Sequence, residues 1–296
     1  MQLTRRAFLT AAAGLAATRA ASAQDYPIID IHQHTPYSGR TADQLVAHQR
    51  TMGIAKTVLL PAGRRYGLAA DAGGNDVVWE LAMRYPAEYA VFTNELPDIP
   101  ETRPVLEKYL KMGAIGIGEQ KFPVECDSKH IHLLADIAQE FDVPVLLHFE
   151  HENYNFHIER FYKVLEAHPK VNFIGHAQTW WGNVDKNHDQ TVMYPKTRVT
   201  PGGITDRYLS DYANMYGDLS AGSGQNSLLR DEEQARGFLK RHQDKLLFGS
   251  DCSDPDGKGE KCIGTNTLAA IRRLAPDETA VRKILHVNAT RLMRIT

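Results

Sequence analysis

The sequence has little of what marks several protein classes. Its 296 residues include only three cysteines, too few for a fold held together by disulfides. The 34 lysines and arginines are balanced by 36 aspartates and glutamates, so the basic excess typical of nucleic-acid-binding proteins is missing. No apolar run reaches the roughly 20 residues that a membrane span needs. These absences argue against nucleic acid as a partner and against a stable membrane anchor.

Histidine, in contrast, is abundant. The chain contains 13 histidines, several of them close together in the sequence. Because imidazole binds metals and titrates near neutral pH, such clusters indicate metal or acid–base chemistry. The remaining composition, with 43% hydrophobic and 24% charged residues, is that of an ordinary globular protein.

The N-terminus has the three parts of an export signal. Arg5 and Arg6 precede a short, weakly apolar stretch, and Ala21-Ser22-Ala23 supplies a small-residue cleavage site. The paired arginines resemble the twin-arginine (Tat) signal of bacteria. We therefore expect residues 1–23 to be a cleavable signal peptide read by the Tat machinery. Residues 24–296 would then form a periplasmic or secreted protein.

The rest of the chain alternates between short apolar runs and segments with helical spacing. Leu45, His48 and Met52, for example, share one helix face. The apolar runs are continuous, as in strands that are buried on both faces of a parallel sheet. The expected strands are 28–31, 56–60, 89–93, 114–118, 144–147, 171–175, 215–219 and 245–249.

Eight strands separated by helices predict an α/β fold, the (β/α)₈ or TIM barrel, whose usual size is about 250 residues. A doubly wound open sheet would carry a Gly-rich phosphate-binding turn after its first strand, and the sequence has none there. No linker, repeat or low-complexity tract divides the chain, so we expect one domain. The long connection 177–203 is expected to be a lid or a binding surface.

Polar side chains follow the predicted strands at their carboxyl ends, which form the functional face of such a barrel. His32 and His34 are two residues apart on the first strand, so their imidazoles point the same way. Four later strands end in Glu119 and Lys121, His148, His176, and Asp251. Imidazoles and carboxylates together suit a divalent metal, with zinc as the default for chemistry without redox steps. The pattern predicts a site for one or two ions.

With these motifs the chain resembles the amidohydrolase superfamily, in particular the amidohydrolase-related branch. That branch includes aminocarboxymuconate-semialdehyde decarboxylase and some lactonases and hydratases. The resemblance covers residues 24–296 and rests on Asp30-Ile-His-Gln-His34, Leu147-His148, Ile174-Gly-His176, Leu247-Phe-Gly-Ser-Asp251 and Asn288-Ala-Thr-Arg-Leu292. It implies that His32, His34, His148 and Asp251 are metal ligands. It also implies that His176 is either a ligand of a second metal or a base that helps to activate water.

The fourth strand leaves two possibilities. Members of the superfamily with two metals often bridge them with a carboxylated lysine or a glutamate from this strand. Glu119 and Lys121 have the same parity, and we favour Glu119 as a ligand because a carboxylate ligates without modification. In the alternative, the two side chains only neutralise each other in the barrel mouth.

The ligand set suggests a metal-dependent hydrolase of a small lactone, ester or amide. Asp251 would accept a proton from water and return it to the leaving group, assisted by His176. The same architecture supports a non-oxidative decarboxylase of a small carboxylic acid, and ligand spacing does not separate the two. A third hypothesis is a periplasmic metal- or solute-binding protein without turnover, against which Asp251 argues.

Substrate contacts are less specific. Arg64 and Arg65 follow the second strand, where they either grip a carboxylate or lie solvated on the surface. Trp180 and Trp181 either stack on a ring-shaped or sugar-like substrate or pack the long loop. Asp218 and Ser220, at the end of the seventh strand, either contact the pocket or form a hydrogen-bonded turn.

The cysteines also leave alternatives open. Cys252 and Cys262 bracket the loop 253–261 and would, after export, either form a disulfide or remain thiols. Cys126 has no evident partner. The oligomeric state is equally open, and a homo-oligomer is compatible with the sequence.

Overall fold

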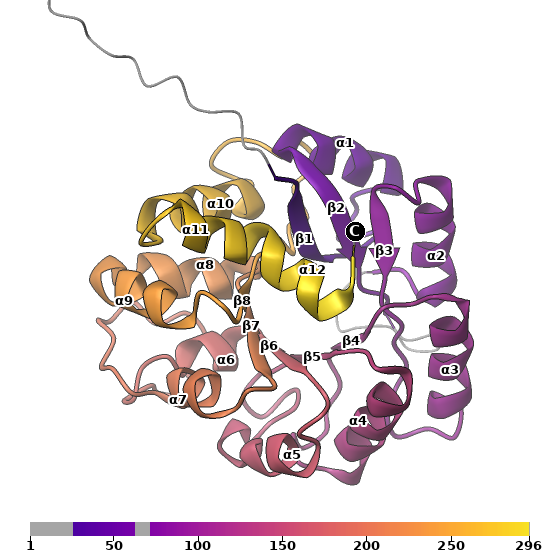
Figure 1. Cartoon of the computed structure of the whole chain (residues 1–296), viewed down its shortest axis with the longest axis horizontal. Helices are drawn as coiled ribbons and strands as arrows, with labels where there is room; N and C mark the ends of the chain where they lie inside the picture. Colours follow the sequence, from indigo (N-terminus) through magenta and orange to yellow (C-terminus); the bar gives the residue numbers. More distant parts are fainter. Residues whose placement is uncertain (1–25, 63–71, 296) are drawn as a thin grey trace, which may run out of the picture.

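The computed structural model describes residues 26–62 and 72–295. Within these residues, eight strands form a ring that helices surround (Figure 1). The strands are β1 (Ile28–Gln33), β2 (Ile54–Leu59), β3 (Tyr89–Val91), β4 (Ile117–Gln120), β5 (Val145–His148), β6 (Phe173–His176), β7 (Met215–Asp218) and β8 (Leu246–Leu247). Each overlaps one of the predicted strands.

The strands close into a barrel in chain order. Parallel ladders join neighbouring strands in two sets, β1-β2-β3 and β4-β5-β6-β7-β8. The gap between β3 and β4 is bridged where Thr93 N donates to Gly116 O at 2.9 Å, and that between β8 and β1 where Asp251 N donates to His32 O at 2.8 Å. The described chain is therefore the predicted α/β barrel.

Helices cover the outside of the barrel and one of its ends. The first of them begins at a Thr41 capping box and ends at Gly53, whose φ of 75° suits glycine. In the described residues, no helix combines the length and apolar character of a membrane span. The helices are α1 (Ala42–Met52), α2 (Asn75–Arg84), α3 (Thr102–Met112), α4 (Lys129–Phe141), the 3₁₀-helix η1 (Ile158–Arg160), α5 (Tyr162–Ala167), α6 (Gln178–Gly182), α7 (Ile204–Asp211), α8 (Ala221–Leu229), α9 (Glu232–His242), α10 (Ile263–Leu274), α11 (Glu278–Arg282), the π-helical stretch η2 (Lys283–Val287) and α12 (Asn288–Met293).

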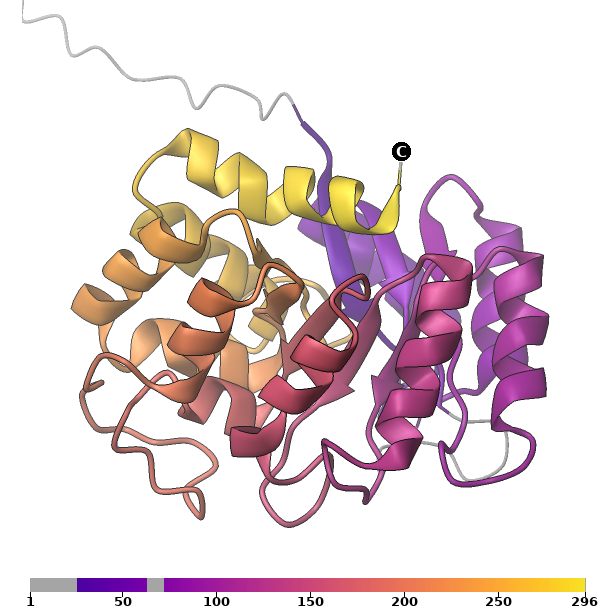
Figure 2. The same ribbon diagram turned by 60° about the horizontal axis from the view of Figure 1, so that its bottom comes forward.

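The barrel interior is a packed core and not a channel. Ile31, Phe92 and Leu146 belong to one buried cluster with Leu292 and Met293 of α12. Helix α12 lies across the amino ends of the strands and covers that end of the barrel (Figures 1 and 2). Only the carboxyl ends of the strands are therefore left for a functional site.

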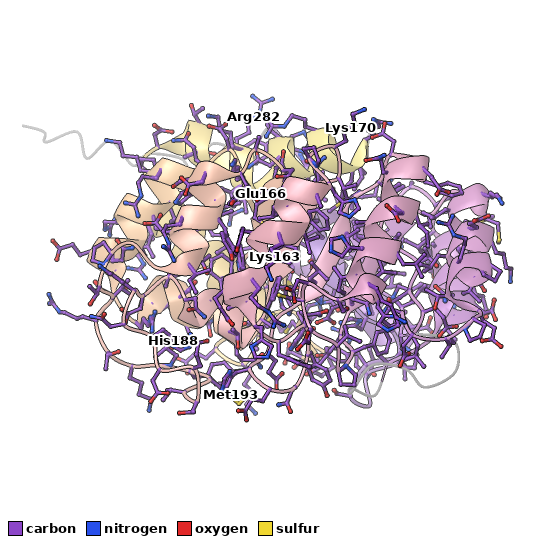
Figure 3. All side chains as sticks on the ribbon, turned by 90° about the horizontal axis from the view of Figure 1, so that it is seen from below. Lys163, Glu166, Lys170, His188, Met193 and Arg282 are labelled. Atoms are coloured by element: carbon purple, nitrogen blue, oxygen red, sulfur yellow. The ribbon has the colours of Figure 1, made fainter. Side chains whose placement is uncertain are left out.

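The long connection after β6 differs in part from the expectation. It opens with the short helix α6, so its irregular part runs from 183 to 203. Figure 3 shows His188 and Met193 of this segment at the opposite end of the molecule from Arg282 of α11. The segment therefore lies on the side of the strands' carboxyl ends.

Candidate metal centre

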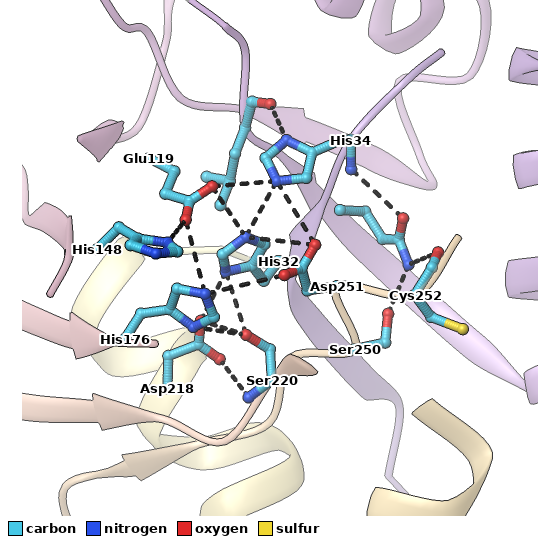
Figure 4. Close-up of polar contacts among 12 residues, drawn as sticks. His32, His34, Glu119, His148, His176, Asp218, Ser220, Ser250, Asp251 and Cys252 are labelled. Carbon is cyan, nitrogen blue, oxygen red and sulfur yellow. Dashed lines mark hydrogen bonds and ion pairs between the residues drawn. The ribbon is translucent and has the colours of Figure 1, made fainter. Parts of the chain in front are cut away.

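Six predicted site residues converge at the carboxyl ends of the strands (Figure 4). They are His32 of β1, His34 directly after β1, Glu119 of β4, His148 of β5, His176 of β6 and Asp251, which follows β8. The first five are buried, and the side chain of Asp251 is 12% exposed. Residues that are more than 200 positions apart in the sequence thus form one cluster, as the strand-end pattern predicted.

His32 of β1 and His34, which directly follows β1, point their Nε2 atoms at each other. His32 Nδ1 lies 2.7 Å from Asp218 Oδ2, and His34 Nδ1 lies 2.7 Å from the Leu60 carbonyl oxygen. Because these partners only accept, each Nδ1 donates to its partner. The two Nε2 atoms are 3.2 Å apart. A divalent cation beside them would take both nitrogens as ligands in place of their protons.

The charges around His32 also favour a cation. Burial opposes the charged form of His32, but Asp251 and Asp218 outweigh burial and raise the pKa of this histidine well above its ordinary value. For Glu119, burial likewise opposes the charge, while His148 holds the pKa well below its ordinary value. The cluster thus keeps Glu119 ionised and attracts positive charge.

Asp251 has an unsatisfied oxygen that faces the cluster. Asp251 Oδ1 is buried and has no hydrogen-bond partner among the residues that the structure describes. It lies 3.6 Å from His34 Nε2 and 3.9 Å from His32 Nε2. A buried carboxylate oxygen without a partner costs free energy, and a bound cation would remove that cost. The donor set therefore fits a divalent metal ion.

Two overlapping groups of donors could hold such ions. The first is His32, His34 and Asp251, and the second is His32, Glu119 and His176, with the donor atoms of each group within 4.8 Å of one another. Glu119 Oε2 lies 3.2 Å from His34 Nε2 and thus reaches both groups. The arrangement accommodates one ion or two.

His148 occupies a different place from the one the resemblance implied. Its Nδ1 lies 2.5 Å from Glu119 Oε1, and its Nε2 lies 3.0 Å from Glu150 Oε2. Both nitrogens are therefore engaged by carboxylates, and His148 belongs to neither donor group among the described residues. In this arrangement it links Glu119 to Glu150 at the edge of the cluster.

Asp218 orients two of the histidines, a role that the sequence analysis left open. Its Oδ2 lies 2.7 Å from His32 Nδ1 and 3.3 Å from His176 Nδ1, and it accepts a hydrogen bond from Ser220 Oγ at 2.7 Å. Despite burial, His32 and His176 hold the pKa of Asp218 far below its ordinary value. A carboxylate behind a ligating imidazole fixes its tautomer and raises its basicity. In the sequence, the position of Asp218 at the end of a predicted strand was the feature that could have indicated this role.

Asp251 itself is held by a network around the junction of β8 and β1. Asp30 accepts a hydrogen bond from Ser250 N at 2.9 Å, and Arg40 Nη1 donates to Cys252 O at 2.5 Å. Asp251 adopts a φ of 42°, which is uncommon for a residue with a side chain. Such strain persists where the surroundings enforce it, often at functional sites.

Tyr37 is a further residue that the sequence analysis did not single out. Its ring centroid lies 4.9 Å from that of His34. The charge of Asp251 and burial both raise its pKa, so its phenol stays protonated and can donate a hydrogen bond into the site.

Of the two alternatives for Trp180 and Trp181, the structure has packing and not stacking on a substrate. Trp180 is 0% and Trp181 2% exposed, so neither presents a face to a substrate. Trp180 stacks on Phe149 with ring centroids 5.8 Å apart, and Trp181 Nε1 donates to Asp218 O at 2.8 Å. Both are packing residues behind the site, because α6 turns them inward as soon as β6 ends.

The other candidates lie at the rim or beyond the described chain. Lys121 Nζ is 5.5 Å from the ring centroid of Tyr154, outside the metal cluster. Arg64 and Arg65 fall in 63–71, outside the described residues. A cavity of about 240 Å³ is lined by Glu150, whose Oε2 lies 3.0 Å from Nε2 of the cluster residue His148. Its other lining residues include His151, Gln178, His188, Gln190 and Met193.

Comparison with known proteins shows which family and which solved structures the chain is similar to. The amidohydrolase family model matches residues 29–295, whereas no curated protein matches the chain. An uncharacterised TIM-barrel protein from Bordetella bronchiseptica is 15% identical with a TM-score of 0.66, covering 91% of this chain and 99% of its own.

Two further solved structures share the fold at low identity. A probable 2-pyrone-4,6-dicarboxylic acid hydrolase from Acinetobacter baumannii is 14% identical with a TM-score of 0.62, over 91% of this chain and 100% of its own. The 2,6-dihydroxybenzoate decarboxylase from Rhizobium is 16% identical with a TM-score of 0.59, over 90% and 98%. At such identities these structures support the fold alone. Because the family match runs from β1 to the end of the last helix, the chain belongs to the amidohydrolase family of enzymes.

Proposed function

We propose that the protein is a divalent-metal-dependent hydrolase of a small carbonyl substrate, a lactone, ester or amide. This proposal rests on the environment of Asp251. One of its oxygens is buried and unpartnered, 3.6 Å from His34 Nε2. A carboxylate in this place is available both to a metal and to a proton. Zinc is the ion we propose, because the donors are imidazole and carboxylate and the reaction needs no redox step.

The chain's own residues supply the proton transfers. A divalent ion, when bound, makes water acidic enough to ionise near neutral pH and polarises a carbonyl oxygen. Asp251 accepts the proton of the attacking water and afterwards delivers it to the departing oxygen or nitrogen. The Asp251 Oδ2 atom lies 3.8 Å from His176 Nε2, which is near enough for His176 to assist this transfer. Tyr37, kept protonated beside Asp251, offers a hydrogen bond to the substrate carbonyl.

The residues around the cavity beside the cluster favour a small, polar substrate, in particular one that carries a carboxylate. The cavity of about 240 Å³ beside Glu150 has room for a small molecule only. Lys121 lies close enough to Glu150 to help to lower the pKa of that carboxyl, after the hydrogen bond from His148. Two of the similar structures are named for ring compounds that carry carboxylates, 2-pyrone-4,6-dicarboxylic acid and 2,6-dihydroxybenzoate. We therefore propose a carboxylated ring compound as the substrate class.

A decarboxylase is the second candidate, and His148 is the observation that favours it. Its two nitrogens lie 2.5 and 3.0 Å from carboxylate oxygens of Glu119 and Glu150. An imidazole between two carboxylates can pass a proton between them and the substrate. Such a group could deliver a proton to the carbon from which carbon dioxide has left, a step that a hydrolase does not need.

The test combines a substrate panel with one carboxylate variant. We expect lactones and esters of small ring carboxylic acids to be hydrolysed, with heavy oxygen from labelled water appearing in the product acid. Asp251→Asn should lose at least about 10²-fold in turnover, since a general acid–base group typically contributes that much or more. Asp256→Asn, an exposed aspartate on the following loop, is the matched control and should leave turnover unchanged.

Two results would contradict the hydrolase. Release of carbon dioxide without incorporation of oxygen from water would select the decarboxylase. Wild-type turnover by Asp251→Asn on an established substrate would remove Asp251 from the mechanism. Metal content measured by mass spectrometry on the same samples separates loss of the base from loss of the ion.

A further inference from the structure

A second set of metal-binding side chains lies outside the catalytic cluster. His48 of α1, Cys252 after β8 and Cys262 at the start of α10 are all buried, and their donor atoms lie within 4.8 Å of one another. The thioether of Met52, one helical turn beyond His48, also reaches them, with its Sδ 3.8 Å from Cys262 Sγ. Three segments that are distant in the sequence thus bring three sulfurs and an imidazole together.

The distances within this set match the edges of a tetrahedron around an ion. The two cysteine Sγ atoms are 3.7 Å apart, and His48 Nε2 lies 3.4 Å from Cys262 Sγ. Metal–sulfur bonds of about 2.3 Å and metal–nitrogen bonds of about 2.0 Å place tetrahedral donors about 3.5–3.8 Å apart. In a disulfide the sulfurs are about 2.0 Å apart. The two cysteines are free thiols in the structure.

The surroundings favour the ligand form of these side chains. Cys262 Sγ accepts hydrogen bonds from Thr265 N at 3.4 Å and from Thr265 Oγ1 at 3.3 Å, at the N-terminus of α10. His48 is fully buried, and the nitrogen that faces the sulfurs is its Nε2, 3.4 Å from Cys262 Sγ, while its Nδ1 has no hydrogen-bond partner among the described residues.

We propose that His48, Cys252 and Cys262 bind a thiophilic d¹⁰ ion, Cu⁺ or Zn²⁺, with Met52 as a fourth donor. Thiolate and thioether sulfur select soft ions, whereas the imidazoles and carboxylates around Asp251 suit harder divalent ions. The two sites therefore differ in chemistry although Cys252 follows Asp251 directly. Binding releases the thiol protons to solvent. The ion ties α1 and α10 to the chain segment that carries Asp251.

Cobalt binding provides a test whose spectroscopic signal the catalytic cluster cannot produce. Reduced, metal-free protein is titrated with Co²⁺, and a sulfur-to-cobalt charge-transfer band is sought in the near-ultraviolet. A cluster of nitrogen and oxygen ligands gives no such band. We expect the band in the wild type at one equivalent per chain and its loss in Cys262→Ser. Cys126→Ser is the matched control, because Cys126 is also a buried thiol but donates to the His157 carbonyl instead.

Further measurements separate the two ions and guard against a variant that fails to fold. Separate titrations with Zn²⁺ and with Cu⁺, each competing against bound Co²⁺, show which ion binds more tightly. X-ray absorption of the wild type at the metal edge should show sulfur neighbours at about 2.3 Å. His48→Gln keeps both thiols and should weaken cobalt binding at least about tenfold, the lower end of what losing support for a metal site costs.

The proposal is overturned by either of two outcomes. One is a reduced wild-type protein that shows neither the charge-transfer band nor sulfur neighbours of the metal. The other is a Cys252–Cys262 disulfide in peptide maps of the purified protein.

Discussion

The hydrogen bond between Asp218 and His32 decides which nitrogen of His32 faces the metal cluster. Asp218 also contacts His176, so one carboxylate fixes the orientation of two imidazole rings. Replacing it by asparagine removes the charge behind both rings and lets either ring turn or change tautomer. The geometry of the site therefore depends on a residue that does not itself face the cluster.

Asp218→Asn should lower metal affinity about 10–100-fold, the usual cost of losing a carboxylate behind a ligating histidine. Competition with a chelator of known affinity measures this change. Asp98→Asn, at an exposed aspartate, is the control and should bind metal as the wild type does. Unchanged affinity in Asp218→Asn would show that His32 is oriented without its help.

Trp180→Ala should lower the free energy of unfolding by about 3–5 kcal/mol, as large-to-small changes of buried aromatics do. The reason is the loss of packing against Phe149 and against Gly175, where even a Cβ would meet the indole ring. Urea denaturation measures the effect, with exposed Tyr194→Ala as control. If Trp180 instead stacked on the substrate, Trp180→Ala would raise KM and leave the free energy of unfolding unchanged.

The strand-end residues were predictable because local sequence reveals where a buried strand ends. His32, His34, Glu119, His176 and Asp251 meet as expected for that reason. The sequence could not reveal the burial of Trp180, since neighbouring tryptophans look alike whether they pack or bind. Nor could it pair His148 with Glu150, because that contact depends on side-chain rotation and not on position along the strand.

At the scale of elements, strands were easier to predict than helices. A strand buried on both faces is a continuous apolar run, which is readable without tertiary context. Helix α8 has the sequence AGSGQNSLL, in which small and polar residues hide the apolar face. It forms because it packs against α6, α9 and α10 and not because of its own periodicity. For such helices tertiary contacts outweigh the local pattern.

The contact between α7 and α9 should make stability depend on pH. Asp206 Oδ1 lies 2.5 Å from His242 Nε2, and its Oδ2 lies 3.0 Å from Arg241 Nη2. Burial opposes the charge, but the hydrogen bonds with His242 and Arg241 hold the pKa of Asp206 below its ordinary value. Because the folded-state pKa is lowered, this stabilisation is complete above the usual pKa of aspartate and disappears as the pH falls through the folded-state value.

Asp206→Asn should therefore be less stable than the wild type at pH 7, and the difference should shrink below about pH 4. Urea denaturation across this range provides the comparison. Asp211→Asn, an exposed position on the same helix, should show no such trend. A difference that stays constant down to pH 2 would mean that Asp206 acts through packing and not through its charge.

At the scale of the whole molecule, the twin-arginine motif is the feature with the largest cellular consequence. We propose that residues 1–23 direct export of the folded protein through the Tat machinery. Replacing Arg5 and Arg6 with lysines should leave the protein in the cytoplasm, at its full unprocessed mass. Cell fractionation with mass determination checks this, with Arg19→Lys as a control outside the paired motif. Export of the double variant would exclude the Tat route.

The barrel closes where its first and last strands meet, and the metal cluster straddles that seam. His32 lies in β1 and His34 directly after it, while Asp251 follows β8 and hydrogen-bonds to the β1 backbone. During translation the two histidines leave the ribosome more than 200 residues before their carboxylate partner. A nascent polypeptide therefore has no complete set of donors that includes Asp251 until biosynthesis has passed β8, so an ion that needs Asp251 would bind only to the nearly finished chain. Truncated or stalled products lacking the C-terminal fifth would carry His32 and His34 without this carboxylate.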